Sequence, residues 1–221
     1  YLYKFLHIFN PSITIQYVDV IYPAIAFAIG LVFFYLLVKE LFDYKLALVS
    51  SAFLMVVPAF LFRTMSGVSD KDALGMTLMF AVFYFYIKSW KSKTFRKGLI
   101  FGLLAGISTA AMGLTWGGVN FLFLIIGLFA LVEIFFDKFT KKDLIIYGVY
   151  LIFTEVVLYL YFPGRFNLAT YLTSLTTGVA NIILIAGIIK IFIVDKYPKL
   201  KSSLKSEKLP NSIFSFIITF I

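Results

Sequence analysis

Apolar residues fall in seven long blocks, and short connectors between the blocks hold most of the charged side chains. Each block is 15 to 19 residues long. An apolar helix of about 20 residues spans the roughly 30 Å hydrocarbon core of a bilayer, and flanking Lys or Trp side chains extend a shorter one by reaching the interface. The pattern therefore predicts seven transmembrane helices, at residues 21–38, 46–62, 73–87, 99–114, 119–136, 144–162 and 177–194, with a truncated eighth opening at Ile213.

Composition supports this fold class, an all-α polytopic transmembrane helix bundle. Of the 221 residues, 62% are hydrophobic and 14% are charged, whereas a soluble domain is about half apolar and about one quarter charged. The sequence has no cysteine, which excludes disulfides, thiolate metal sites and cysteine nucleophiles. We expect residues 1–221 to form one transmembrane domain. Because the chain starts at Tyr1 and its last apolar run is too short to cross a bilayer, we expect an internal fragment of a longer protein.

Lysine and arginine are divided unevenly between alternate connectors. The first, third, fifth and seventh connectors hold two, five, three and six of them, sixteen in all, and the intervening connectors hold only Arg63, Lys71 and Arg165. Cytoplasmic connectors are enriched in these residues. The pattern therefore places the sixteen cations on the cytoplasmic side, facing anionic lipid, and the second connector on the non-cytoplasmic side. This distribution accounts for the net charge of +9 without nucleic acid, and we expect no nucleic-acid partner.

The second connector carries two carboxylates, Asp70 and Asp72, just before the third block. In a regular helix they would point about 200° apart, but in a loop or a first turn both could converge on a hard cation such as Mg²⁺ or Mn²⁺. A structural interpretation is also open, because Ser69-x-x-Asp72 resembles a capping box and both carboxylates would favour the helix dipole. The two interpretations are compatible, since a capped first turn also fixes the direction of Asp70.

Arg63 ends the second block, five residues after Pro58, which should kink that helix. An arginine at this level either anchors the helix by reaching the interface, or binds a lipid-linked phosphate or orients an aspartate. Both interpretations of Arg63 are kept.

Three further features bear on packing or function. Gly102, Gly106 and Ala110 form a small-residue stripe, which predicts close approach of another helix. Trp116, followed by two glycines, predicts an interfacial anchor in a tight turn. Glu155 lies inside the sixth block, where a carboxylate is either functional, protonated or paired with an unseen helix.

Two motifs resemble one known family, the oligosaccharyltransferase catalytic subunit. Residues 63–67 (Arg-Thr-Met-Ser-Gly) and 70–72 (Asp-Lys-Asp), preceded by Val57-Pro58, resemble its second acidic motif. The turn at 113–118 (Gly-Leu-Thr-Trp-Gly-Gly) also resembles this family, closest to its archaeal branch. Both motifs lie in connectors that the cation distribution makes external. The resemblance covers about residues 20 to 120 and is topological beyond them.

This resemblance implies a membrane glycosyltransferase of the GT-C type. Such an enzyme transfers an oligosaccharide from a polyprenyl (dolichol-type) phosphate carrier to Asn in an Asn-X-Ser/Thr sequon, so its partners are the lipid-linked oligosaccharide and an acceptor polypeptide. In the family, a divalent metal (Mn²⁺ or Mg²⁺) is bound by an aspartate of the first external loop, the acidic pair of the second and a glutamate of a later one. Asp70 matches the second-loop ligand, Asp72 its partner and Arg63 the supporting arginine.

This chain departs from the family pattern at both ends. Against that pattern we expect the segment to begin after the first external loop and to end before the glutamate loop and the soluble C-terminal domain, so we expect it to be inactive alone. An archaeal source would place it in the cell membrane. Two alternatives stay open: another glycosyltransferase that uses a lipid-phosphate sugar, such as a protein O-mannosyltransferase-like enzyme, and a transporter that uses Glu155.

Overall fold

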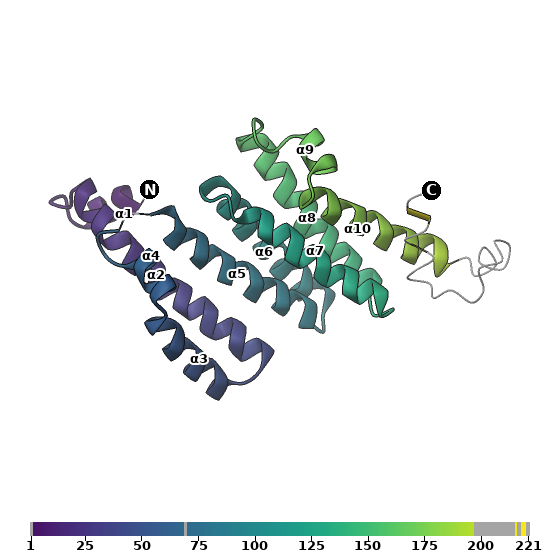
Figure 1. Ribbon diagram of the computed structural model, residues 1–221, viewed down its shortest axis with the longest axis horizontal. Helices are drawn as coiled ribbons and strands as arrows, with labels where there is room; N and C mark the ends of the chain where they lie inside the picture. Colours follow the sequence, from purple (N-terminus) through teal and green to yellow (C-terminus); the bar gives the residue numbers. More distant parts are fainter. Residues whose placement is uncertain (1, 69, 197–214, 216–217, 220–221) are drawn as a thin grey trace.

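The computed structural model describes residues 2–68, 70–196, 215 and 218–219, and the regular structure in that part of the chain is entirely helical (Figure 1). All seven apolar blocks are helical. Among the described residues, five helices are long and apolar enough to cross a membrane, which makes this a multi-pass membrane protein. They are α2 (Ile15–Leu41), α5 (Lys71–Lys91), α6 (Phe95–Thr115), α8 (Lys141–Tyr161), and α10 (Thr177–Ile189) with its π-helical continuation η1 (Lys190–Val194).

The second block is broken rather than kinked. Helices α3 (Tyr44–Val56) and α4 (Pro58–Thr64) meet at an angle of 67°. Pro58 has no backbone N–H to continue the ladder, and Val57 before it is extended, with φ −67° and ψ 116°. The proline signal is thus confirmed, and α3 with α4 is a sixth candidate span.

The remaining helices are shorter. Helix α7 (Val119–Phe135) covers the fifth block with 17 residues. Helices α1 (Leu2–Phe9) and α9 (Leu168–Thr173) lie outside the predicted spans and are too short to cross a bilayer. Most of the eighth apolar run, opening at Ile213, lies outside the described residues.

Polar residues set the helix boundaries. Thr140 begins α8 with a capping box: its hydroxyl accepts from the Asp143 backbone N–H (3.4 Å), while the Asp143 carboxylate accepts from the Thr140 N–H (3.0 Å). Asp43 caps α3 in the simpler way, accepting from the Leu46 N–H at 2.8 Å. Between such ends the helices satisfy their own backbone groups, which the hydrocarbon core requires because it offers no other hydrogen-bond partner.

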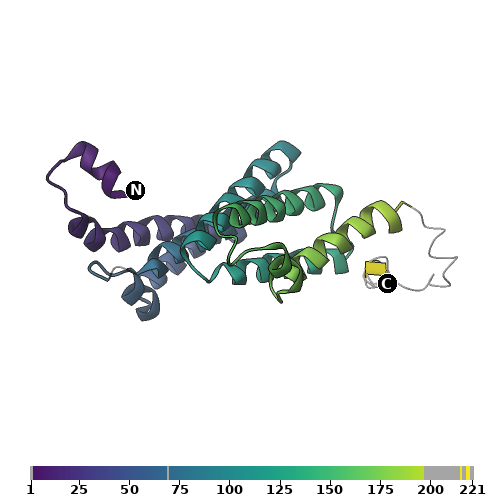
Figure 2. The same cartoon turned by 90° about the horizontal axis from the view of Figure 1, so that it is seen from above.

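The helices pack as a row rather than around a central axis. Helix α2 contacts α3 and α5, α5 contacts α6, α6 contacts α8, and α10 packs against both α7 and α8. Figures 1 and 2 show the long helices running side by side along one direction. Most of the completely buried large side chains lie on α7 and α8, among them Phe123, Tyr147, Tyr150 and Leu158. At the other end of the row, α3 leaves apolar side chains such as Phe53 exposed, as a lipid-facing helix does.

The small-residue stripe lies where α6 meets α8, as predicted. A Cβ atom at Gly106 would lie 3.2 Å from the carbonyl oxygen of Tyr150, so the two backbones are in near contact. The Thr154 hydroxyl donates to the Gly106 carbonyl at 3.2 Å. Close packing and an interhelical hydrogen bond together hold the pair, as expected where both helices already face an apolar medium.

Substitution of Gly106 should therefore destabilise the fold. We expect Gly106→Ala to lower the free energy of unfolding by about 1–3 kcal/mol, because the added methyl presses on the α8 backbone. Gly148→Ala is the matched control: it is also a helix-interior glycine, but its Cβ would meet only Leu184 Cδ1 at 3.6 Å. Thermal unfolding of the full-length protein in detergent measures both. Equal unfolding temperatures for the two variants would refute the close-packing account.

Candidate functional site

The acidic pair and Arg63 form one cluster at the start of α5. Arg63, in the last turn of α4, places its Nη1 3.2 Å from Asp70 Oδ2, and the same nitrogen donates to Asp72 Oδ2. The side chain of Asp72 is 14% exposed, whereas that of Arg63 is 52% exposed. The structure therefore brings together the three side chains singled out from the sequence, and it directs both carboxylates to one point.

Helix capping explains why the two aspartates converge. Asp70 is the N-cap of α5, with an extended backbone (φ −116°, ψ 141°), and its carboxylate accepts from the Asp72 N–H at 3.4 Å. Because Asp70 precedes the helix, the 200° separation expected inside a regular helix does not apply. The predicted capping box is wrong in register. Asp72 is the second helical residue rather than the third, and Ser69 lies outside the described residues.

The loop before Asp70 is tied to the first turns of α2. The Ser66 hydroxyl donates to the Val20 carbonyl at 2.8 Å, and the Gly67 N–H donates to the same oxygen at 3.0 Å. The Tyr22 hydroxyl donates to the Asp70 carbonyl. These bonds link residues more than forty positions apart. Nothing in the local sequence marked Tyr22 as part of the site.

The tryptophan turn lies against the same helix. A Cβ atom at Gly75 would lie 2.7 Å from Trp116 Cε3, so the indole packs directly on the α5 backbone. Gly75 is one turn after Asp72 and shares its face of α5. Arg165, in the connector from α8 to α9, places Nη2 3.5 Å from the Gly117 carbonyl. The two motifs are thus joined through α5, and Arg165, which had no assigned role, reaches the turn.

The donor set of the acidic cluster suits a hard divalent cation. Two carboxylates within reach of one guanidinium nitrogen provide oxygen ligands of the kind that Mg²⁺ and Mn²⁺ prefer. Within the described residues, His, Cys, Asp and Glu form no group of three that could hold a metal. Asp70 and Asp72 are therefore an incomplete set, and a full coordination shell requires ligands from elsewhere.

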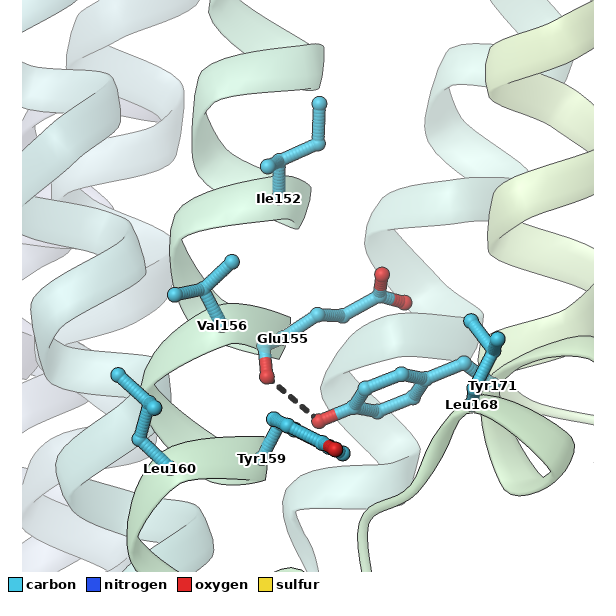
Figure 3. Close-up of a pocket in the computed structure, with 7 residues that line it drawn as sticks. All are labelled: Ile152, Glu155, Val156, Tyr159, Leu160, Leu168 and Tyr171. Carbon is cyan, nitrogen blue, oxygen red and sulfur yellow. Dashed lines mark hydrogen bonds between the residues drawn. The ribbon is translucent and has the colours of Figure 1, made fainter.

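Glu155 occupies a different place, on α8. Its carboxylate Oε1 accepts from Asn181 Nδ2 at 2.7 Å, and its backbone carbonyl accepts from the Tyr171 hydroxyl at 2.7 Å, the dashed line in Figure 3. An apolar pocket of about 350 Å³ adjoins it, lined by α8 and α9 side chains including Ile152 and Leu168. Glu155 is thus paired, but within this chain rather than with an unseen helix: it connects α8 with α9 and α10.

Comparisons with known proteins point to one protein family. The family model described as "Oligosaccharyl transferase STT3, N-terminal" matches residues 1–220. The dolichyl-diphosphooligosaccharide–protein glycosyltransferase subunit stt3 of Schizosaccharomyces pombe is 29% identical over 149 residues, which cover 67% of this chain and 19% of the relative. Subunit STT3 of Saccharomyces cerevisiae is 27% identical over 104 residues, 47% of this chain and 14% of the relative.

A solved structure has the same fold. The oligosaccharyltransferase of Archaeoglobus fulgidus, in complex with Zn and sulfate, superposes with a TM-score of 0.67 at 20% identity, covering 99% of this chain and 29% of that chain. This likeness confirms the predicted all-α GT-C membrane fold. The chain spans less than one third of the relatives and of the solved protein that it matches.

The loop before α5 requires a positive φ at Gly67. Its φ of +89° is strained for any residue with a Cβ, although no atom lies near enough to obstruct one. We expect Gly67→Ala to cost about 1–2 kcal/mol of stability through backbone strain alone. Gly164→Ala is the matched control, at another exposed loop glycine with open space around it but without a positive φ. A lower unfolding temperature only in Gly67→Ala supports the strained turn; equal effects contradict it.

Proposed function

Because the chain belongs to the STT3 oligosaccharyl transferase family, we propose that it is part of a membrane enzyme for protein N-glycosylation. The enzyme transfers an oligosaccharide from a polyprenyl (dolichol-type) phosphate carrier to Asn of an Asn-X-Ser/Thr sequon. The observation that carries the proposal is the cluster in which Arg63 contacts both Asp70 and Asp72. Membership of this family favours glycosyl transfer over the alternative function, transport through Glu155.

In this proposal Asp70 and Asp72 are metal ligands. A bound divalent cation, Mn²⁺ or Mg²⁺, supplies positive charge to stabilise the leaving phosphate. The complex of the Archaeoglobus fulgidus protein with Zn and sulfate supports a divalent cation and a site for a tetrahedral anion in this family. The remaining ligands and the recognition of the sequon belong to parts of the protein beyond these residues.

Arg63 is a positioning residue. Its guanidinium offsets the repulsion between two adjacent carboxylates and holds both on one side of the helix start. Because it is half exposed, its other nitrogens remain open to a phosphate oxygen of the lipid carrier. The α2 contacts through Ser66 and Tyr22 keep the loop in place while the side chains bind.

The acidic cluster faces the non-cytoplasmic side in this proposal. The connections α4–α5, α6–α7 and α8–α9 lie at one end of the long helices, and the lysine-bearing connections α2–α3, α5–α6 and α7–α8 lie at the other (Figure 1). The positive-inside rule assigns the cation-rich end to the cytoplasm. A lipid-linked oligosaccharide and a translocated polypeptide would then meet at the outer interface, beside Asp70.

Substitution of the acidic pair tests the function. In the full-length protein, Asp70→Asn and Asp72→Asn should each lower the rate of sequon-peptide glycosylation roughly 100-fold, because stabilisation of the leaving charge is lost. Asparagine caps helices as well as aspartate does, so stability should change little at Asp70. The matched control is Asp43→Asn at the N-cap of α3. Glycosylation of the peptide at the wild-type rate by Asp70→Asn would refute the assignment.

Sidedness is tested independently by labelling. These 221 residues contain no cysteine, so in a cysteine-free variant of the full-length protein a single cysteine can be introduced by Val68→Cys beside the acidic cluster or by Lys141→Cys at the start of α8. Both positions are exposed. In intact cells, or in outside-out vesicles, a membrane-impermeant maleimide should label the first variant and not the second. The reverse pattern would overturn the orientation while leaving the cluster itself intact.

A further inference from the structure

A lysine-lined cavity of about 290 Å³ lies at the end of the long helices opposite the acidic cluster. It is formed by the last turn of α2, the last turn of α5 and the first turns of α6, and Figure 1 shows the α2–α3 and α5–α6 connections at that same end. Its main side chains are Glu40, Lys88, Lys91, Lys93, Lys97 and Phe101. Four lysines therefore surround one carboxylate in a recess of the protein.

Two of the lysines are held in place by the protein. Lys88 has three contacts: its Nζ donates to the Tyr84 hydroxyl at 2.9 Å, lies 3.8 Å from Glu40 Oε2 and lies 5.6 Å from the centre of the Phe101 ring. Lys91 donates to the Glu40 backbone carbonyl. These contacts hold Lys88 and Lys91 in place. They also pair Glu40, the one carboxylate that lines the cavity, with Lys88.

The other two lysines are available to a ligand. Within the described residues, neither Lys93 nor Lys97 has an ion-pair or hydrogen-bond partner, and both are exposed. The first turn of α6 adds positive charge, since the Thr94 side chain makes no capping bond to it and the dipole of this 21-residue helix points its positive end here. The free charge of the cavity is thus positive and unneutralised.

We propose that this cavity binds the phosphate headgroup of an anionic phospholipid. The cavity lies at the ends of helices that are long and apolar enough to cross a membrane, which is where lipid headgroups would lie, and its lining includes the apolar ring of Phe101, further along α6 than Lys97. A phosphodiester on a glycerol backbone matches both the lysines and this ring, whereas a soluble anion needs only the lysines. Basic recesses between transmembrane helices on the predicted cytoplasmic side are suited to such lipids.

Lipid binding to the purified full-length protein tests the proposal. Native mass spectrometry with phosphatidylglycerol, phosphatidylcholine and inorganic phosphate as probes gives the relative affinities, and detergent solution makes both faces accessible, so the result does not depend on sidedness. We expect the combined variant Lys93→Gln, Lys97→Gln to bind phosphatidylglycerol about 25-fold more weakly, at roughly a factor of five for each lysine. Phosphatidylcholine should bind equally weakly to wild type and variant.

A matched variant separates the site from general surface charge. Lys138→Gln with Lys141→Gln removes two exposed lysines from the same end of the molecule but outside the cavity, and should leave phosphatidylglycerol affinity unchanged. Glu40→Gln should strengthen binding, because it removes the only negative charge of the recess. Equal losses in the two lysine pairs, no preference for phosphatidylglycerol, or equal affinity for free inorganic phosphate would each overturn the proposal.

Activity provides the link to the proposed enzyme. In phosphatidylcholine alone, Lys93→Gln with Lys97→Gln should glycosylate a sequon peptide at the wild-type rate, since the cavity is at the other end of α5 from Asp70. Loss of lipid selectivity with activity intact supports the lipid site. A lack of glycosylation in every variant and in wild type would count against the proposed function and not against the lipid measurement.

Discussion

The hydrocarbon core offers no hydrogen-bond partner, and this constraint determines the rest of the structure. It makes the chain cross as helices, because only a helix satisfies its own backbone within one segment. It also restricts charged side chains to the helix ends, apart from those that find partners, as Glu155 does with Asn181. Chemistry is therefore confined to two thin zones, and the helices between them serve as spacers and supports.

The break before Pro58 is what creates the acidic cluster. A continuous helix would carry Arg63 onward along the direction of α3, but the 67° bend turns α4 back toward α2 and α5. Arg63 then meets the carboxylates at the start of α5. One guanidinium offsets the repulsion of two acids, and the oxygens that it holds are those that a hard cation would bind. The carboxylate oxygens that Arg63 contacts are thus the same oxygens that the proposed cation would need.

Helices α5 and α6 give the molecule two ends of opposite character. At one end they carry Asp70, Asp72 and the Trp116 turn, and at the other the lysines of the α5–α6 connection. Contacts at both ends keep the two helices in register. At one end the Trp116 indole packs on Gly75, and at the other the Ser89 hydroxyl donates to the Gly98 carbonyl at 2.6 Å. The packed pair α5–α6 thus separates the proposed catalytic end from the proposed lipid-binding end.

Much of the fold follows directly from the sequence. The seven apolar blocks, the break at Pro58 and the stripe around Gly106 are local signals, each readable within one turn or one span because the bilayer imposes a fixed length and a fixed polarity. Short helices α1 and α9 were missed, since neither is a span. The capping register at Asp70 was misjudged by one residue, because either Ser69 or Asp70 suits an N-cap and only the three-dimensional contacts choose between them.

The site itself was decided by the tertiary structure. The residue types at 63, 70 and 72 pointed to oxygen ligands and a supporting cation, but their convergence depends on the angle between α4 and α5. The site also depends on contacts between segments about forty or more positions apart. These are the hydrogen bonds of Val20 and Tyr22 to the loop before α5 and the packing of Trp116 on Gly75. Such contacts depend on which helices become neighbours. Hydropathy within a single span carries no such information, because lipid and a neighbouring helix are equally apolar.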